Sequence, residues 1–429
     1  MSQIIDIFKE ITSIPRCSGT HTPFINYMKD IALKAGFLCL TDTHNNILIK
    51  KENQKAKLAF QSHYDIVCLS DNCVPVIIED SDILSAKDST LGSDNGIGCA
   101  YMIKLILDGV NGEFLFTSDE EIGLIGANNL DLEINAPYML NLDSEEEAGI
   151  CIGCAGGVDI FASNLNKKII PNTENLDLYE ISISKLQGGH SGVDIDKSIP
   201  NAIKLMAKTI KEANAKLLDI NGGERINSIP VNVKAIIASK TAPIPSHENM
   251  TIEKIDTKSE HLNIFDDKII DFIYNFENGV RSLNDELGVV QNSINLAIIS
   301  TNQDSIKLEL SARSMANNEL AELKDETIKM LEEHNFTVTT DGKYPAWKPD
   351  INEFTNKVLE IYKEVNEHAS LEAIHAGLEC AIFKDKYPHI KVASIGPSIE
   401  FPHSRKERVS KQSVENVFEV VEKIVKEIC

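Results

Sequence analysis

The stretch that decides the fold is LFTSDEEIGLIGANNLDLEINAPYMLNLDSEEE, residues 115–147. Apolar runs at 113–117 and 138–142 predict two buried strands, and residues 123–130 between them predict a short helix. Acidic residues follow both strands directly: Asp119, Glu120 and Glu121 after the first, and Asp143 after the second. Open α/β sheets place their chemistry at the carboxyl ends of such strands. This unit therefore predicts an α/β sheet with an acidic site at one edge.

So dense a cluster of carboxylates is electrostatically unfavourable unless a cation lies among them. Runs of acidic residues are also common in solvated surface loops. The segment alone leaves a metal site and a pair of solvated loops as open interpretations.

Length and composition narrow the class of protein. The chain has 429 residues, enough for two domains with sizeable cores. Its net charge of −23 disfavours nucleic acid and anionic membrane as partners. The sequence contains no apolar stretch of the roughly 18 residues that a membrane-spanning helix needs. Its first residues also lack the pattern of a signal peptide.

The nine cysteines are odd in number and scattered along the chain. Without an export signal, this distribution favours a reducing cytoplasm. Cys151 and Cys154 form a single CxxC pair, whereas a structural zinc site needs four ligands, so both are expected to be small buried residues.

The α/β pattern is interrupted once. Residues 176–342 read as strands with one exposed face, interleaved with helices, which is typical of an α+β layer. Within that layer, the polar stretch 240–262 is expected to be a loop. The prediction is a catalytic α/β domain with a mostly parallel sheet, residues 1–175 and 343–429, split by an inserted α+β domain, residues 176–342.

Further candidate ligands follow other predicted strands of the catalytic domain. The candidates are His63 and Asp65 after one strand, Asp94 at the head of a helix, and His403 after the last strand. Each alone has an ordinary explanation, such as a helix cap or a turn. Strand ends in such a sheet share one edge. Two imidazoles with several carboxylates suit zinc, cobalt or manganese, and two such ions can share a bridging carboxylate.

The order of these motifs resembles a known family. The matching stretches are SHYDIV at 62–67, TLGSDNGIG at 90–98, SDEEIG at 118–123, NLDSEEE at 141–147, GCAGG at 153–157, GGHSG at 188–192, INSIP at 226–230, AIHAGLEC at 373–380 and SIGPSIEFPHS at 394–404. The chain resembles the cocatalytic zinc exopeptidases that include carnosinase, peptidase T and glutamate carboxypeptidase, and within them the aminoacyl-histidine (Xaa-His) dipeptidase branch.

That resemblance implies two divalent metal ions, zinc in the first place, with manganese or cobalt as alternatives. It implies these roles: His63 and Asp143 on one metal, Glu121 and His403 on the other, Asp94 as bridge, Asp65 orienting His63, and Glu120 as general base. It also implies a cis peptide bond between Asp94 and Asn95.

The resemblance further implies substrate-binding residues. His190 would stabilise the oxyanion, Arg313 would bind the substrate carboxylate, and Glu379 would bind its amine; Asn227 and His375 complete the set. A loop histidine, an exposed arginine at a strand end and helix packing are the ordinary explanations of His190, Arg313 and the His375–Glu379 segment. The inserted domain would act as a lid and form a homodimer.

The implied activity is cytoplasmic hydrolysis of small peptides, namely dipeptides of the Xaa-His type or of broad specificity. In it, a hydroxide bridging the metals attacks the carbonyl and Glu120 takes its proton. An N-acyl amino acid deacylase, a tripeptide aminopeptidase and a non-catalytic metal-binding scaffold are the alternatives. A scaffold should have lost a ligand or the base, and this chain retains them all.

Two segments depart from the family pattern. The loop at 71–87 is shorter than usual, and SRKERVS at 404–410 is more basic than the usual acidic continuation. Neither contains a predicted ligand, so the departures bear on substrate preference.

Overall fold

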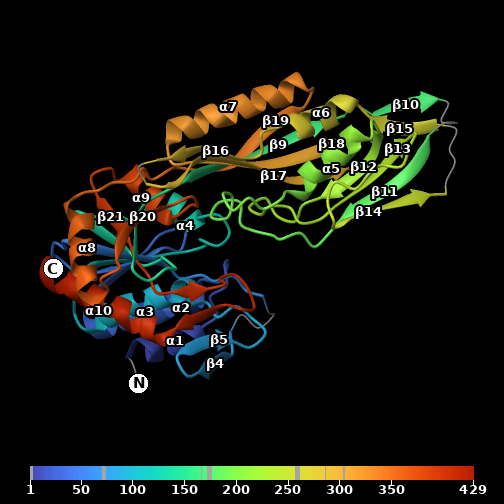
Figure 1. Ribbon diagram of the computed structural model, residues 1–429. Coiled ribbons are helices and arrows are strands. Elements are labelled where there is room, and N and C mark those ends of the chain that lie inside the picture. The colour runs from blue at the N-terminus through green and yellow to red at the C-terminus, as the bar shows by residue number, and fades with distance from the viewer. Residues whose placement is uncertain are drawn as a thin grey trace. The chain divides into compact units, whose positions relative to one another are not determined.

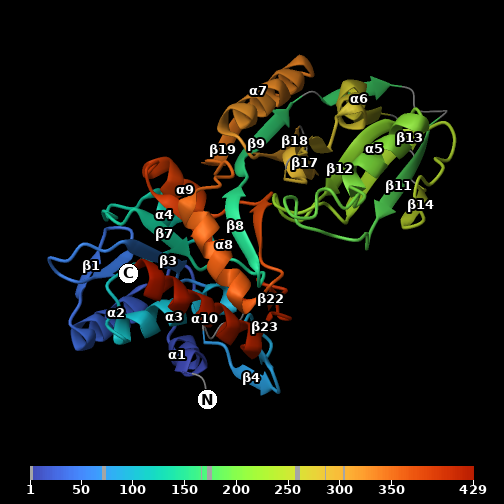
Figure 2. The same cartoon turned by 60° about the vertical axis from the view of Figure 1, so that its left-hand side comes forward.

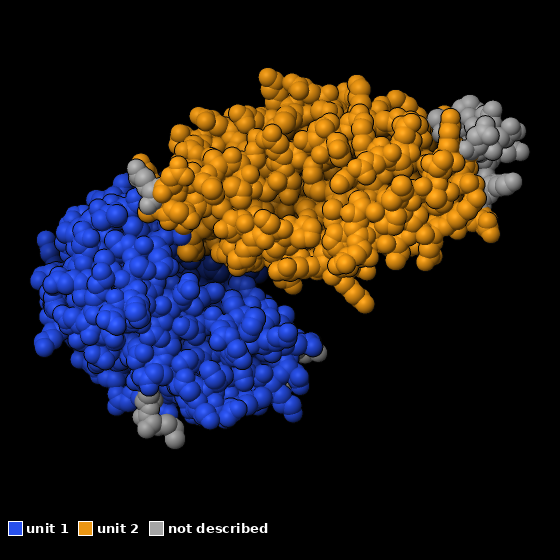
Figure 3. All heavy atoms as spheres, viewed as in Figure 1, with its two compact units in different colours: residues 1–153, 349–373, 378–429 blue, residues 154–348, 374–377 orange. Residues whose placement is uncertain are grey.

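The computed structural model describes residues 3–69, 74–165, 167–171, 176–256, 261–285, 287–302 and 305–429. Position 71, where the shortened loop begins, lies outside the described residues. The chain forms two compact units (Figure 3). Unit 1 comprises residues 1–153, 349–373 and 378–429, and unit 2 comprises residues 154–348 and 374–377. Unit 2 starts earlier than the predicted residue 176, because β9 (Gly156–Asn164) pairs with two strands of the unit 2 sheet.

The centre of unit 1 is an eight-stranded sheet in the order β1-β2-β6-β3-β7-β21-β8-β20. Figure 1 labels β20 and β21 of this sheet, and Figure 2 labels β1, β3, β7 and β8. Its strands are β1 (Leu38–Thr41), β2 (Ile47–Lys50), β3 (Leu58–His63), β6 (Glu113–Thr117), β7 (Tyr138–Asn141), β8 (Gly149–Cys154), β20 (Ser370–Ile374) and β21 (Lys391–Ser394). The central strands β6, β3, β7 and β21 are parallel, as predicted. Their carboxyl ends therefore lie at one edge of the sheet.

Five helices pack with this sheet in one hydrophobic core. They are α1 (Gln3–Thr12), α2 (Thr22–Ala35), α3 (Ser93–Leu107), α8 (Glu353–Val365) and α10 (Lys411–Ile428). Phe60 and Phe114 belong to this core, whereas their buried neighbours Ala59 and Leu115 do not. Successive strand residues point to opposite faces, so both faces of the sheet are covered. The short helices α4 (Ile125–Asn128) and α9 (Glu379–Lys386) contact each other outside that core.

A small antiparallel sheet completes unit 1, with strands β4 (Ile77–Asp80), β5 (Ile83–Ala86), β22 (Ile399–Glu400) and β23 (Arg408–Ser410). Within the described ranges, no helix is both long enough and apolar enough to cross a membrane.

Unit 2 is built on a nine-stranded antiparallel sheet in the order β14-β11-β13-β12-β17-β18-β9-β19, with β16 also paired to β17. Its other strands are β11 (Asp177–Ile183), β12 (Lys216–Gly222), β13 (Val233–Ser239), β14 (Met250–Ile255), β16 (Gly279–Asn284), β17 (Val289–Thr301), β18 (Ile306–Ser314) and β19 (Thr337–Tyr344). A separate strand pair, β10 (Lys167–Pro171) and β15 (His261–Phe265), and the helices α5 (Ala202–Glu212), α6 (Asp267–Asn275) and α7 (Asn317–Glu333) complete it. The expectation of a loop at 240–262 holds for residues 240–249 but was wrong for β14 and the start of β15, while residues 257–260 lie outside the described residues.

Candidate metal centre

The predicted metal ligands of unit 1 lie at the ends of its central strands. His63 is the last residue of β3, Glu121 follows β6, and Asp143 follows β7. Register places His63 opposite Thr117 and Gln61 opposite Asn141, so the three strands end at nearly the same level. Level strand ends bring ligands that are far apart in the sequence to one edge of the sheet.

Asp94 enters the same edge from the start of α3. Asp94 and Asn95 have non-helical backbone angles, and the peptide bond between them is cis, as predicted. The start of α3 lies close to β3. A Cβ added to Gly98 of α3 would lie only 2.2 Å from Ser62 Oγ. Only glycine allows this approach.

The carboxylate of Asp94 lies between the two histidines. Its Oδ1 is 3.0 Å from His63 Nε2, and its Oδ2 is 2.9 Å from His403 Nε2. A second carboxylate faces each ring: Asp143 Oδ1 lies 3.2 Å from His63 Nε2, and Glu121 Oε2 lies 2.9 Å from His403 Nε2. The result is two sets of donors that share Asp94.

The buried carboxylates of this cluster are stabilised by positive charge. Burial and the neighbouring Asp94 raise the pKa of Glu121 to about 7. Burial lowers the pKa of His403, but Asp94 and Glu121 outweigh it and raise that pKa to about 11. Without a cation, protons on the histidines would balance the carboxylates.

The donor set fits two divalent cations. Imidazole nitrogen and carboxylate oxygen are the ligands that zinc, manganese and cobalt accept. One donor atom from each of His63, Asp94 and Glu121 falls within 4.8 Å of the others. Glu121 Oε1 is also buried without a hydrogen-bond partner among the described residues, which leaves a lone pair for an ion. The His403 side chain is 48% exposed against 2% for His63, so that side of the cluster is open.

Asp65 contacts the His63 ring and also supports the neighbouring turn, and the sequence did not predict the second contact. His63 Nδ1 lies 3.1 Å from the backbone carbonyl oxygen of Asp65 and 3.7 Å from its carboxylate Oδ1. The carbonyl can only accept, so it fixes the proton on Nδ1 and leaves Nε2 as the ligand atom. The Asp65 carboxylate also accepts the backbone N–H groups of Glu120 at 3.0 Å and Glu121 at 3.3 Å. It thereby orients the turn that carries both glutamates.

A chain of buried polar side chains beneath the ligands was missed in the sequence. Gln61 Nε2 donates to Glu379 Oε2 at 2.5 Å, and Asn141 Nδ2 donates to Gln61 Oε1 at 2.5 Å. Ser394 donates to Asn141 Oδ1, which also accepts the N–H of Asp143 at 3.2 Å. The available signal was a polar residue in each of several otherwise apolar strands, since buried polar groups need partners.

Glu407 also has a role that the sequence did not predict. It lies inside the basic run 404–410, yet its side chain is buried and accepts from Leu91 N, Ser93 N and Ser93 Oγ at 2.6–2.9 Å. These bonds fix the turn directly before Asp94.

Replacing Glu407 with alanine is expected to weaken metal binding and turnover by about 10–100-fold, as for other groups that orient metal ligands. The three donors at Leu91 and Ser93 would lose their acceptor, and Asp94 would lose its fixed turn. Glu400→Ala is the matched control, because Glu400 lies seven positions before Glu407 but pairs with Arg408 at the surface. Metal titration and kcat measure the effect; equal behaviour of the two variants would contradict it.

The predicted residues of unit 2 form a cluster of their own. His190 makes an isolated antiparallel bridge with Ser228, and Ser191 N donates to the carbonyl oxygen of Asn227 at 2.8 Å. His190 Nδ1 lies 3.2 Å from Gly192 N and 3.3 Å from Val193 N, both of which donate. An accepting Nδ1 leaves the proton of the neutral ring on Nε2.

Arg313 and His375 are buried in unit 2. Arg313 Nη1 donates to the Tyr344 hydroxyl at 2.6 Å, and Arg313 Nε has no partner in the described part of the chain. His375 Nε2 lies 2.7 Å from Ser293 Oγ, and burial with nearby Arg313 lowers the pKa of His375 to about 3. Positive charge from Arg313 beside a neutral imidazole suits an anionic ligand group.

Glu379 belongs to unit 1 and is fully buried at the start of α9. Its Oε2 accepts from Thr117 Oγ1 at 2.7 Å as well as from Gln61, while its Oε1 has no partner among the described residues. Burial raises the pKa of Glu379 to about 8. The charge of His63 lowers this pKa and that of Asp143 raises it, so both ligand candidates act on Glu379 electrostatically.

Comparisons with known proteins place the chain in a family. Residues 59–427 match the family described as Peptidase family M20/M25/M40. The chain is 31% identical to the cytosol non-specific dipeptidase of Escherichia coli (strain K12), over 99% of this chain and 97% of that protein.

Solved structures agree with this placement. The aminoacylhistidine dipeptidase from Vibrio alginolyticus matches with a TM-score of 0.82 and 26% identity, covering 100% of this chain and 96% of that chain. Human carnosine dipeptidase 1 shares the fold, with a TM-score of 0.56 and 13% identity over 99% of this chain and 96% of that chain. The chain belongs to peptidase family M20/M25/M40.

Proposed function

We propose that this peptidase is a cytoplasmic two-metal dipeptidase of the Xaa-His type or of broad specificity. The observation that carries the proposal is Asp94, whose two oxygens face two different histidines, each with a second carboxylate. His63 and Asp143 would hold one ion and Glu121 and His403 the other, with Asp94 shared. Zinc is the proposed metal, and manganese or cobalt would suit the same donors. When bound, two such metal ions lower the pKa of a water molecule and polarise the substrate carbonyl.

Glu120 is the proposed general base. Its backbone N–H donates to Asp65, which fixes the position of the Glu120 backbone beside Glu121. Burial raises the pKa of Glu120, and the negative charges of Glu121, Asp143 and Glu379 raise it further against the effect of His63. A carboxyl group with a raised pKa is better matched to taking a proton and returning it to the leaving amine near neutral pH.

His190 is the proposed donor to the oxyanion of the tetrahedral intermediate. The N–H groups of Gly192 and Val193 fix its neutral tautomer, so Nε2–H is the donor. His190→Ala is expected to lower kcat by roughly 10²–10³-fold, the effect of removing one oxyanion donor. His247→Ala, also in unit 2, is the control. A kcat within twofold of the parent protein would remove His190 from this role.

Arg313 is the proposed site for the substrate carboxylate, with His375 and Asn227 as neighbouring candidates. The Tyr344 hydroxyl accepts a hydrogen bond from the guanidinium. The Tyr344 side chain packs against Gly157 and Gly377, where a larger residue would collide with it. An added Cβ would lie 2.4 Å from the Tyr344 hydroxyl at Gly157 and 2.7 Å from the ring at Gly377.

Arg313→Ala is expected to raise KM for free dipeptides about tenfold or more, because a hydrogen bond to a charged group contributes roughly 1.5–3 kcal/mol. Tyr344→Phe should give a smaller rise in KM, with kcat unchanged, because the arginine loses its anchor but keeps its charge. Dipeptide amides, which lack the carboxylate, should show neither effect. Equal increases for amides and free dipeptides would show that the carboxylate is bound elsewhere.

Glu379 is the proposed acid for the substrate amine, through the oxygen that lacks a partner. This residue separates the dipeptidase from an N-acyl amino acid deacylase, whose substrate has no free amine. A panel of dipeptides including Xaa-His, their N-acetylated forms and tripeptides, assayed with zinc, manganese or cobalt, tests the assignment. Preference for acetylated substrates would favour the deacylase, preference for tripeptides the aminopeptidase, and no hydrolysis a scaffold.

We further propose a homodimer formed through unit 2, which light scattering would test.

A further inference from the structure

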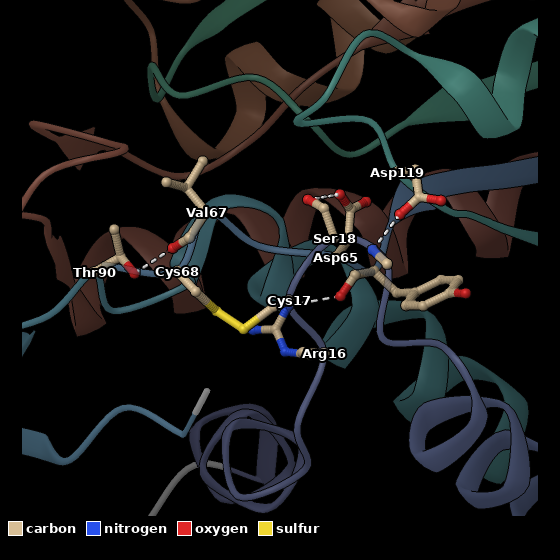
Figure 4. Close-up of a disulfide and its surroundings, with 10 residues drawn as sticks. Arg16, Cys17, Ser18, Asp65, Val67, Cys68, Thr90 and Asp119 are labelled. Atoms are coloured by element: carbon tan, nitrogen blue, oxygen red, sulfur yellow. Dashed lines mark hydrogen bonds between the residues drawn. A yellow bond between two sulfur atoms is a disulfide. The ribbon is translucent and has the colours of Figure 1, made fainter. Parts of the chain in front are cut away.

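The segment between α1 and α2 is linked covalently to the strand end that carries Asp65. A disulfide joins Cys17 to Cys68, with the two Cα atoms 5.6 Å apart and 51 positions apart in the sequence (Figure 4). The scattered cysteines gave no indication of this pair. Cys17 also bridges Ile66 in parallel register, and the Ile66 N–H donates to the carbonyl oxygen of Arg16 at 3.1 Å. The bond therefore closes a contact that the backbone already makes.

Residues beside Cys17 hold both sides of the turn that carries Glu120 and Glu121. Ser18 Oγ donates to Asp65 Oδ2 at 2.7 Å, and Gly19 N donates to Asp119 Oδ1 at 2.7 Å (Figure 4). Asp119 has a positive φ of 52°, a backbone conformation that is uncommon for a residue other than glycine. Asp65 passes the restraint on, because its carboxylate accepts the N–H groups of both glutamates.

Arg16 extends the restraint to the turn before Asp94. Its guanidinium is buried and donates to the carbonyl oxygens of Tyr64 at 2.9 Å and Gly92 at 2.7 Å. On the other side of the disulfide, Thr90 Oγ1 donates to the carbonyl oxygen of Val67 at 2.5 Å (Figure 4). Residues 16–19, 64–68 and 90–92 thus form one connected support, which we call the brace. The brace contacts the chain next to His63, Asp94 and Glu121.

We propose that the Cys17–Cys68 disulfide is a redox-controlled positioning element for the metal centre. In the oxidised protein it keeps Ser18 on Asp65 and Gly19 on Asp119; in the reduced protein the brace opens more often, and metal retention and turnover fall. The proposal rests on the proposed function for its effect on turnover, but its effect on the brace does not depend on any substrate. A chain in the cytoplasm would meet both states, because thiol reductants there oppose disulfides and oxidants form them.

The redox step is ordinary thiol–disulfide exchange. A thiolate of a small dithiol attacks one sulfur of the disulfide and displaces the other cysteine as a thiolate, which takes up a proton. The second thiol of the reductant then attacks the mixed disulfide and releases the first cysteine. Two electrons and two protons pass from the dithiol to Cys17 and Cys68, and the dithiol becomes a cyclic disulfide.

The test compares oxidised and dithiol-reduced holoenzyme, with the state of each cysteine established by alkylation and mass spectrometry. Three quantities are measured: the rate of metal release to a chelator, kcat with KM, and hydrogen exchange of the backbone at 16–21 and 118–121. Reduction is expected to accelerate metal release and lower kcat by about tenfold, within the 10–100-fold typical of groups that orient metal ligands. KM should stay unchanged, and exchange in both segments should increase.

Ser18→Ala identifies the route. If the disulfide acts through the Ser18–Asp65 bond, the variant should show the loss already when oxidised and little further loss on reduction, because effects on one pathway are not additive. Cys17→Ser/Cys68→Ser should behave as reduced parent protein, and treating it with the dithiol measures any direct effect of the reductant on the metals. Cys39→Ser/Cys429→Ser should keep the full response.

Three results would overturn the proposal: thiols at Cys17 and Cys68 that do not pair under oxidising conditions, equal metal release and exchange in both states, or an equal further loss in Ser18→Ala. A redox response of metal release in a protein that hydrolyses no dipeptide would instead retain the brace and refute the proposed function.

Discussion

Glu120→Gln is expected to retain both metal ions and to lose about 10²–10⁴-fold in kcat, the contribution of a positioned acid–base group. The amide keeps the size of the side chain and the backbone bond from Glu120 N to Asp65, but it cannot accept a proton. Glu121→Gln should behave differently, because its Oε2 lies 2.9 Å from His403 Nε2 within the proposed second set of ligands. That variant should lose one metal and activity together.

The two variants are controls for each other, since the residues are adjacent and the substitutions change charge and mass identically. Elemental analysis of each purified protein, alongside kcat, separates the roles. One metal in Glu120→Gln with two in Glu121→Gln would mean that the roles are exchanged. Two metals and near-normal turnover in both would show that this turn is not the active site.

Removing the metals is expected to abolish activity, and zinc, manganese or cobalt should restore it. The affinity for metal should fall as the pH falls, because ligands must be deprotonated to bind. In the absence of a cation, the carboxylates raise the pKa of His63 and bring that of His403 to about 11, overcoming burial, which acts in the opposite direction. Both shifts favour protonated rings in the metal-free site, so metal uptake should release protons.

Calorimetric titration in two buffers with different ionisation enthalpies would count the released protons. His403→Ala, which removes one of the two rings, should release fewer. Full turnover after long dialysis against a chelator would contradict the metal assignment, and affinity independent of pH would contradict the protonated state of the histidines.

Much of the site follows from the sequence because of a simple geometric rule. Parallel strands end at one edge, so an acid or histidine after each apolar run can be placed without coordinates. His63, Asp143 and the acidic group 119–121 were predicted in this way, and the strands behave as expected. The choice of Glu121 within that group came from the resemblance. Asp94 and His403 needed the resemblance as well, because each also reads as a cap or a turn residue.

Other features depend on tertiary contacts that local patterns do not encode. Glu407 reads as part of a basic surface run, and only the turn at 91–93 shows why it is buried. The strand β14 reads as polar loop because it lies at the edge of its sheet, where alternate side chains are exposed. The pairing of Cys17 with Cys68 likewise cannot be predicted from the sequence, since the spacing of cysteines does not determine which of them form a disulfide.

The buried polar chain has a consequence for how accurately the strands must align. Gln61 lies opposite Asn141 on one side, and Ser394 lies opposite Asn141 on the other. Sliding one strand by a single residue would set an amide against a leucine, Leu140 or Leu142, and leave buried polar groups unpaired at about 1–3 kcal/mol each. The same slip would shift His63 or Asp143 by about 3.3 Å along the strand. These hydrogen bonds therefore favour the native register of the strands over shifted registers in which the metal ligands could not meet.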